Sequence, residues 1–121
     1  MSAGVWIGIG FLGGLGAVAR FLFDGAIGSL SDSSFPFGTL AVNLTGSLAL
    51  GVLVGSVHDA DVLSLVAVGA IGSFTTFSTW MFETHRLAED GALRLAAINV
   101  AGSLALGIGL AWLGLQIGQA L

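Results

Sequence analysis

The segment GSFTTFSTW, residues 72–80, places five hydroxyl side chains between residues 73 and 79, inside a stretch otherwise hydrophobic enough to cross a bilayer. Apolar surroundings penalise every polar group that lacks a hydrogen-bond partner. In a helix that faces lipid these hydroxyls would lack partners, whereas in a segment that is buried in protein or lines a water-filled path they can form hydrogen bonds. We expect the function of the chain to depend on this segment.

The composition around the segment is that of an integral membrane protein. The chain has 121 residues, of which 55% are hydrophobic and only 8% are charged, whereas soluble domains carry about 25% charged residues. A spanning helix needs about 20 mainly apolar residues, and four stretches qualify, at residues 3–23, 36–57, 62–86 and 92–118. The sequence therefore predicts an all-α membrane protein of one domain, residues 1–121, with four transmembrane helices and short connections that favour an up-and-down bundle.

Charge and cysteine content narrow the classes of function. The net charge is -4, with three arginines, no lysine and no cysteine, which argues against a nucleic-acid partner and excludes disulfides and thiolate sites. The predicted topology puts Arg20, Arg86 and Arg94 on one side of the membrane, so that the positive-inside rule weakly places both termini outside. Because this bias is small, the chain is expected to be able to insert both ways up.

The twenty glycines predict closely packed helices. Residues 8–13 match the dinucleotide-binding pattern G-x-G-x-x-G, but that pattern needs a preceding strand, which this chain lacks. Glycines four residues apart instead let transmembrane helices approach closely. Such pairs are Gly10/Gly14, Gly51/Gly55 and Gly114/Gly118.

Two helical faces carry polar side chains at four-residue spacing, which stacks them along one face of a helix. They are Thr39, Asn43 and Ser47 in the second span, and Asn99, Ser103 and Gly107 in the fourth. One interpretation is a shared polar track through the protein. The other is hydrogen bonding between helices, for which membrane proteins commonly use Ser, Thr and Asn.

The chemistry of these side chains favours an anion. Hydroxyl groups and the Asn amide donate hydrogen bonds, and the spans contain no carboxylate before Glu83, although cation and proton paths usually display intramembrane acids. Phe77 and Trp80 lie within the hydroxyl run and present positive ring edges. Donors and ring edges together predict a site that replaces water around a small anion.

The hydroxyl run is also a poor helix former, because Ser and Thr compete for backbone hydrogen bonds and Gly72 lowers helix stability. A break near residues 73–76 would free carbonyl oxygens that can hold a hard cation such as Na⁺. The alternative is a continuous helix whose hydroxyls bond back to the preceding turn. Arg20 and Glu83 are the two ionisable residues nearest membrane depth, and each has an alternative to a functional role. The Arg20 side chain could extend to the membrane interface, and Glu83 could pair with Arg86 three residues later.

Motifs in all four spans resemble the Fluc (CrcB) family of small fluoride channels. They are Gly13-Gly14-x-Gly16-Ala17-x-x-Arg20, Gly38-Thr39-Leu40-x-Val42-Asn43-x-x-Gly46, Gly72-x-x-Thr75-Thr76-Phe77-Ser78-Thr79 followed by Glu83, and Ser103. The resemblance implies a homodimer of two oppositely inserted subunits in the cell membrane, with two fluoride pores. It implies passive export of fluoride and hence fluoride resistance, without a catalytic step.

The resemblance also implies roles for individual residues. Asn43 and Phe77 would line the pore with Ser103 on the polar track, and we place Trp80, Thr39 and Thr76 on the same pore. Arg20 would attract the anion at a vestibule, while the carbonyls of Gly72 and Thr75 would bind a structural Na⁺ at the centre of the dimer.

Two positions depart from the family pattern. Trp80 stands where a second phenylalanine is usual, and Asn99 where many relatives have tyrosine. An indole keeps a positive edge and adds an N–H donor, but its bulk could narrow the pore. Trp80 and the one-sided arginines therefore leave open a non-conducting or orientation-fixed subunit of a heterodimer.

A small proton-coupled multidrug exporter is a further alternative, but such exporters resemble a pattern with an acidic residue in the first helix, and residues 3–23 contain none. An enzyme is not expected, because no nucleophile, base and orienting group are grouped.

Overall fold

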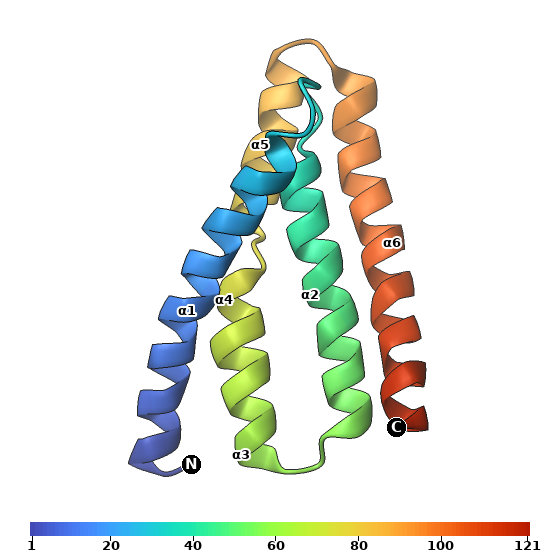
Figure 1. The fold of residues 1–121 in the computed structure, drawn as a ribbon. Helices are drawn as coiled ribbons and strands as arrows, with labels where there is room; N and C mark the ends of the chain where they lie inside the picture. The colour runs from blue at the N-terminus through green and yellow to red at the C-terminus, as the bar shows by residue number, and fades with distance from the viewer.

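Four long apolar helices form the chain, as the sequence predicted, and the computed structural model describes all of residues 1–121 (Figure 1). Helix α1 runs from Ala3 to Gly28 and α2 from Phe37 to Ser56. The third long segment covers residues 60–89, and α6 runs from Leu93 to Ala120. Each of the four is long and apolar enough to cross a membrane. The first helix ends at Gly28, beyond residue 23, where the hydropathy pattern had placed its end.

The third segment is broken, as expected, and consists of four pieces. These are α3 (Ala60–Leu63), the π-helical η1 (Ser64–Ile71), α4 (Gly72–Phe74) and α5 (Ser78–Glu89). Thr75 is extended, with φ -82° and ψ 162°, so residues 75–77 interrupt the helix. The hydroxyls of Ser73 and Thr75 nevertheless donate to carbonyls of the preceding turn, at 2.6 Å to Gly69 and 3.0 Å to Ile71. Both sequence alternatives therefore hold in part: the hydroxyls bond backwards, and the helix still ends there.

Local signals in the sequence explain several helix ends. The Ser2 hydroxyl accepts a hydrogen bond from the Val5 amide at 3.3 Å, and Asp59 Oδ1 accepts one from the Val62 amide at 2.9 Å, both typical N-terminal caps. Pro36 directly precedes α2. Gly91 follows α5 with φ +80°, a conformation that glycine adopts without steric penalty, and it lets the chain turn directly into α6.

Glycines allow α2 and α6 to pack backbone against backbone. A Cβ atom at Gly51 would lie 3.0 Å from Gly114 Cα, and one at Gly55 would lie 3.0 Å from Gly118 Cα. Any larger side chain at these positions would force the helices apart. The prediction that these two pairs mediate close helix packing is confirmed.

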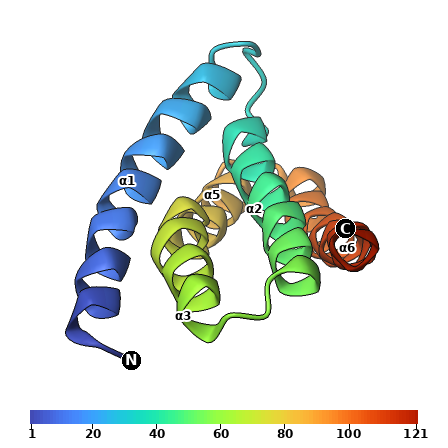
Figure 2. The same cartoon turned by 60° about the horizontal axis from the view of Figure 1, so that its bottom comes forward.

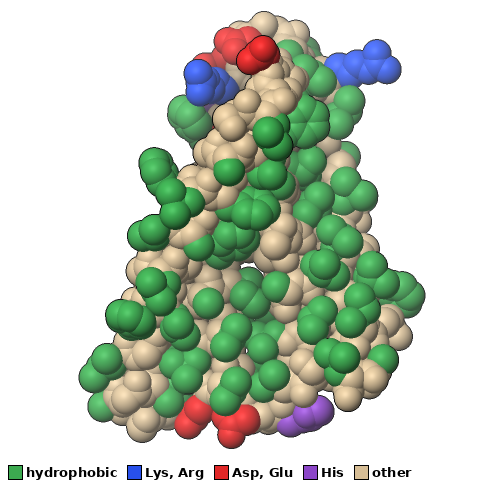
Figure 3. All heavy atoms as spheres, in the orientation of Figure 1, with side chains coloured by type: hydrophobic (Ala, Val, Ile, Leu, Met, Phe, Trp, Pro, Cys, Tyr) green, Lys and Arg blue, Asp and Glu red, His purple; other side chains and the backbone are tan.

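The remaining helices cover this pair only on one side. Figures 1 and 2 show α2 beside α6, with the third segment between α2 and α1, and both termini at the end opposite the α5–α6 turn. The outer face of α1 is bare: Phe11 and Phe21 are 69% and 77% exposed, and a Cβ at Gly10 or Gly14 would meet nothing within 4 Å. Hydrophobic side chains cover the middle of the molecule, and charged ones gather at its two ends (Figure 3).

Candidate functional site

Asn43, in the second turn of α2, links that helix to the break in the third segment. Its Nδ2 donates to the Thr76 carbonyl and its Oδ1 accepts from the Thr76 amide, both at 2.8 Å. Thr76 lies outside any helix, so these bonds satisfy backbone groups that would otherwise be unpaired at membrane depth. A side-chain amide carries two N–H groups, and one of those of Asn43 accordingly remains free.

A cavity of about 420 Å³ lies between α2, the break and α6; we call it the larger cavity. It brings together most of the residues that the sequence predicted for a pore. These are Asn43, Thr76, Phe77, Trp80 and Ser103, accompanied by Ser47, Thr75 and Gly107 among others.

Two aromatic rings form one wall of the larger cavity. The rings of Phe77 and Trp80 meet edge to face, with centroids 5.8 Å apart and an interplanar angle of 82°. Phe77 is 71% exposed, so its ring stands out from the chain. The indole N–H of Trp80 donates to the Asn99 carbonyl at 3.1 Å. The N–H donor that the sequence suggested as an addition to the pore is thus already engaged.

The hydroxyl of Ser103 has no hydrogen-bond partner although it is buried, and it is the one buried side-chain polar atom in the structure of which this is true. It lies on α6 at the wall of the larger cavity. A buried donor without a partner costs about 1 to 3 kcal/mol, so such a group calls for a ligand or water. Asn99, one turn earlier, does not line the cavity; it is 1% exposed and donates to the Thr84 hydroxyl at 2.8 Å.

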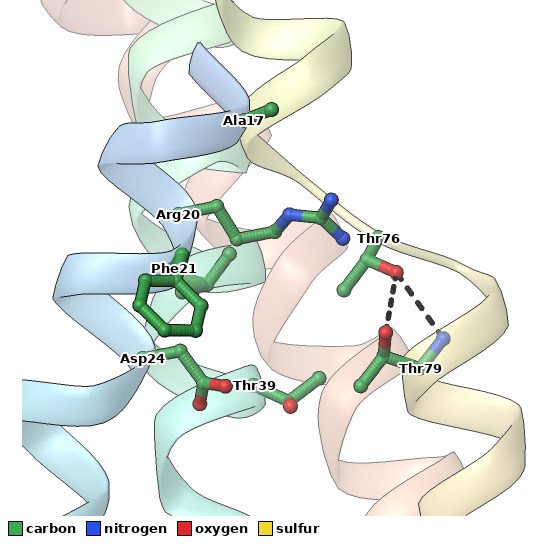
Figure 4. Close-up of a pocket in the computed structure, with 8 residues that line it drawn as sticks. Ala17, Arg20, Phe21, Asp24, Thr39, Thr76 and Thr79 are labelled. Atoms are coloured by element: carbon green, nitrogen blue, oxygen red, sulfur yellow. Dashed lines mark hydrogen bonds between the residues drawn. The ribbon is translucent and has the colours of Figure 1, made fainter. Parts of the chain in front are cut away.

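A second cavity, of about 180 Å³, lies between α1, α2 and the start of α5 (Figure 4); we call it the smaller cavity. The Arg20 side chain extends from α1 toward Thr76 in this view. Thr76 lines both cavities, and its hydroxyl donates to the Thr79 hydroxyl at 3.1 Å and accepts from the Thr79 amide at 3.2 Å. The residues predicted for a vestibule and for a pore therefore meet at Thr76.

Thr39 lines the smaller cavity and not the larger one, so the structure separates it from the other residues of its predicted stripe. It is buried, and its hydroxyl donates to the Glu83 carboxylate. The alternative pairing of Glu83 with Arg86 is not formed. The one salt-bridge contact of the structure joins His85 Nε2 and Glu89 Oε1 at 2.7 Å on the surface, and it is ionic when the imidazole is protonated.

Sequence reasoning missed Asp24, which also lines the smaller cavity. Its carboxylate lies close to Gly38, where a Cβ would come within 3.1 Å of Asp24 Cγ. The available signal was its position four residues after Arg20, which puts both side chains on one face of α1.

The carbonyl oxygens of Gly72 and Thr75, predicted to bind a cation, accept no hydrogen bond. The Thr76 amide, which would have bonded to Gly72 in a continuous helix, is taken by Asn43. Unpaired carbonyl oxygens are suitable ligands for a hard cation, and these residues therefore fit such an ion. Two oxygens alone do not complete the coordination shell of such a cation.

Comparison with known proteins finds relatives that match nearly the whole chain. The sequence model of the family described as CrcB-like protein, Camphor Resistance (CrcB), matches residues 7–115. A protein of Mycolicibacterium paratuberculosis named fluoride-specific ion channel FluC 2 is 42% identical over 118 residues, covering 98% of this chain and 97% of its own length. A fluoride-specific ion channel FluC 2 of Haloarcula marismortui is 50% identical over 107 residues, covering 86% of this chain and 87% of its own length.

The agreement extends over all four long helices, since both the family match and these relatives span nearly the whole chain. The chain therefore belongs to the CrcB family, whose curated relatives are fluoride-specific ion channels.

Proposed function

We propose that the chain forms a fluoride-selective channel through which fluoride leaves the cell passively. The observation that carries the proposal is the unpartnered, buried hydroxyl of Ser103 at the wall of the larger cavity. It faces the same space as Asn43, whose second N–H is free, and as the rings of Phe77 and Trp80. Each of these groups offers hydrogen to an anion, and none offers a negative charge.

The two cavities together suggest a path for the ion. Arg20 attracts an anion into the smaller cavity, where Thr39 and Thr76 supply hydroxyls. Thr76 lines both cavities, so the anion passes from there to the donors of the larger cavity. At each stage hydrogen-bond donors replace part of its water, which is the general basis of selectivity in narrow pores. The carboxylates of Asp24 and Glu83 are confined to the Arg20 end and are absent from the larger cavity.

The channel is proposed to be a homodimer of two oppositely inserted subunits. Phe77 is 71% exposed although it belongs to the wall of the larger cavity, and an aromatic ring at that place is best explained by a second copy that closes the pore over it. The bare face of Gly10 and Gly14 on α1 offers close approach to a neighbouring helix. With three arginines and no lysine, the chain has little charge bias to fix one orientation.

The same dimer would complete the cation site. Gly72 and Thr75 contribute one unpaired carbonyl oxygen each, and the equivalent pair from a second copy would double the set. Oxygen ligands of this kind suit Na⁺, for which we propose a structural role at the centre of the dimer. The ion would neutralise carbonyl dipoles that the helix break leaves without partners.

Fluoride efflux from liposomes tests the proposed function. Vesicles loaded with potassium fluoride and made permeable to K⁺ should release fluoride when they contain this protein alone, and matched vesicles with potassium chloride should not release chloride. Ser103→Ala should lower the fluoride rate by about tenfold without destabilising the fold, since its hydroxyl has no partner to lose. The control is Ser56→Ala, which removes a hydroxyl that donates to the Val52 carbonyl away from both cavities.

Three other outcomes would change the conclusion. Chloride release as fast as fluoride release contradicts a fluoride-selective pore. Equal rates for Ser103→Ala and Ser56→Ala remove Ser103 from the path. A silent wild-type protein whose Trp80→Phe variant conducts would instead identify the chain as a non-conducting subunit that needs a partner.

Single cysteines test the antiparallel dimer, because the natural chain has none. His58 lies in the exposed connection after α2. In intact cells, a membrane-impermeant maleimide should label about half of the His58→Cys molecules, and the remaining molecules should react only after lysis. Glu89→Cys, at the end of α5, should behave in the same way. Complete labelling of one variant with full protection of the other would establish a single orientation.

A further inference from the structure

Three hydrogen bonds form a closed ring beside the larger cavity, two of them between α5 and α6 and one within α5. Trp80 donates its indole N–H to the Asn99 carbonyl at 3.1 Å. Asn99 Nδ2 donates to the Thr84 hydroxyl at 2.8 Å, and that hydroxyl donates to the Trp80 carbonyl, also at 2.8 Å. The ring therefore starts and ends at Trp80, through its side chain and through its backbone.

We propose that Thr84 and Asn99 are positioning residues for Trp80: they hold its indole at the cavity wall with the N–H turned into α6, so that only the apolar ring meets the ion. This inference deepens the proposed fluoride channel and rests on it. It also links Trp80 and Asn99, the two departures from the family pattern noted above, in one contact.

Because the ring is buried, each of its polar groups needs a hydrogen-bond partner within the protein. Asn99 is 1% exposed and is one of the two largest side chains that are fully buried. A buried amide donor without a partner is penalised, and in surroundings of low dielectric each hydrogen bond polarises the next. The Thr84 hydroxyl is the acceptor for Asn99 Nδ2 and the donor to Trp80. Removing that hydroxyl opens the ring at two places at once.

The orientation of the indole matters for the ion. A free indole N–H beside the pore would be a strong donor, and it would offer an anion a place to stop instead of a place to pass. With the N–H bonded to Asn99, Trp80 presents carbon-bound hydrogens at its ring edge, as a phenylalanine does. The edge-to-face contact of Trp80 with Phe77, with centroids 5.8 Å apart, is then kept in one geometry.

A double-mutant cycle between Thr84→Val and Trp80→Phe tests the inference by fluoride efflux from liposomes. Val has nearly the shape of Thr but no hydroxyl. With Trp80 present, Thr84→Val should lower the fluoride rate by on the order of threefold to tenfold, as expected for the loss of one or two hydrogen bonds. With Trp80→Phe, the same change should have little effect, because no indole is left to position. The difference between the two effects measures the coupling.

Two further variants separate positioning from general damage to the fold. Thr84→Ser restores the hydroxyl and should restore the rate, which a purely steric role of Thr84 would not predict. Ser56→Ala removes a comparable hydroxyl bond to a carbonyl one turn back, at 2.7 Å in α2, and should leave the rate unchanged in both backgrounds. Equal effects of Thr84→Val with and without Trp80 would overturn the inference.

A second measurement does not require transport. Hydrogen exchange of the Trp80 indole N–H, followed by NMR and assigned with Trp6→Phe and Trp112→Phe, should be slow in the wild-type protein and at least several-fold faster in Thr84→Val. Exchange unaffected by Thr84→Val would refute the ring even if the protein conducts. If the wild-type protein carries no fluoride, the proposed function fails, whereas exchange that Thr84→Val accelerates still supports the positioning of Trp80.

Discussion

Replacing Asn43 with alanine should destabilise the fold as well as impair conduction. The side chain makes two hydrogen bonds of 2.8 Å to the backbone of Thr76, each worth about 1 kcal/mol. Their loss alone predicts a decrease of about 2 kcal/mol in the free energy of unfolding. Because the Thr76 amide and carbonyl then lie unpaired at membrane depth, the decrease should rise to about 4 kcal/mol where water does not reach them.

Unfolding by SDS in mixed micelles, followed by tryptophan fluorescence at equal protein concentrations, measures this decrease. Ser47→Ala is the matched control, since Ser47 lies one turn later in α2 and also lines the larger cavity but makes no side-chain hydrogen bond. Asn43→Ala should unfold at clearly lower SDS than Ser47→Ala. Identical unfolding of the two variants would show that the Asn43 bonds to the helix break do not stabilise the protein.

Three more perturbations follow from the structure. Phe77→Leu keeps the apolar volume but deletes the ring edge, so fluoride efflux should fall at least tenfold with assembly by size-exclusion chromatography unchanged, and full efflux would mean that Phe77 only packs. Replacing Na⁺ by a large organic cation should slowly inactivate the channel if the carbonyls of Gly72 and Thr75 hold a structural ion, whereas uptake driven by a Na⁺ gradient would indicate coupled transport instead. Gly114→Ala should cost at least about 1 to 3 kcal/mol by forcing a methyl group into the backbone of α2, while Gly109→Ala, with nothing within 4 Å, should be neutral in the same SDS titration.

Much of the fold could be read from the sequence because the membrane imposes simple rules. Apolar stretches of sufficient length gave the four helices, and glycines at four-residue spacing predicted the contact of Gly51 and Gly55 with Gly114 and Gly118. The same spacing at Gly10 and Gly14 has no partner within the chain. The spacing of the glycines shows that one face of a helix allows close packing, but it does not show which helix packs against that face.

The sequence predicted which residues line the candidate site better than it predicted the hydrogen bonds that their side chains make. The hydroxyl run located the break, but both polar groups of the Asn43 side chain bond to Thr76, and the Trp80 N–H bonds to Asn99. A hydrogen-bond donor in the sequence can serve a ligand or the protein itself, and only the three-dimensional neighbours decide between the two. The assignment of Thr39 to the smaller cavity has the same cause, since its neighbour Glu83 comes from a distant part of the chain.

The close contact of α2 and α6 also has a mechanical consequence. Those helices carry Asn43 and Ser103, on two walls of the larger cavity, and at Gly51, Gly55, Gly114 and Gly118 they touch backbone to backbone. Contacts between backbones involve no side-chain rotamers that could change, so we expect α2 and α6 to move as one rigid unit. The remaining wall, with Phe77 and Trp80, is joined to them through side-chain hydrogen bonds. We therefore expect changes in the width of the larger cavity to come from movement of that third wall.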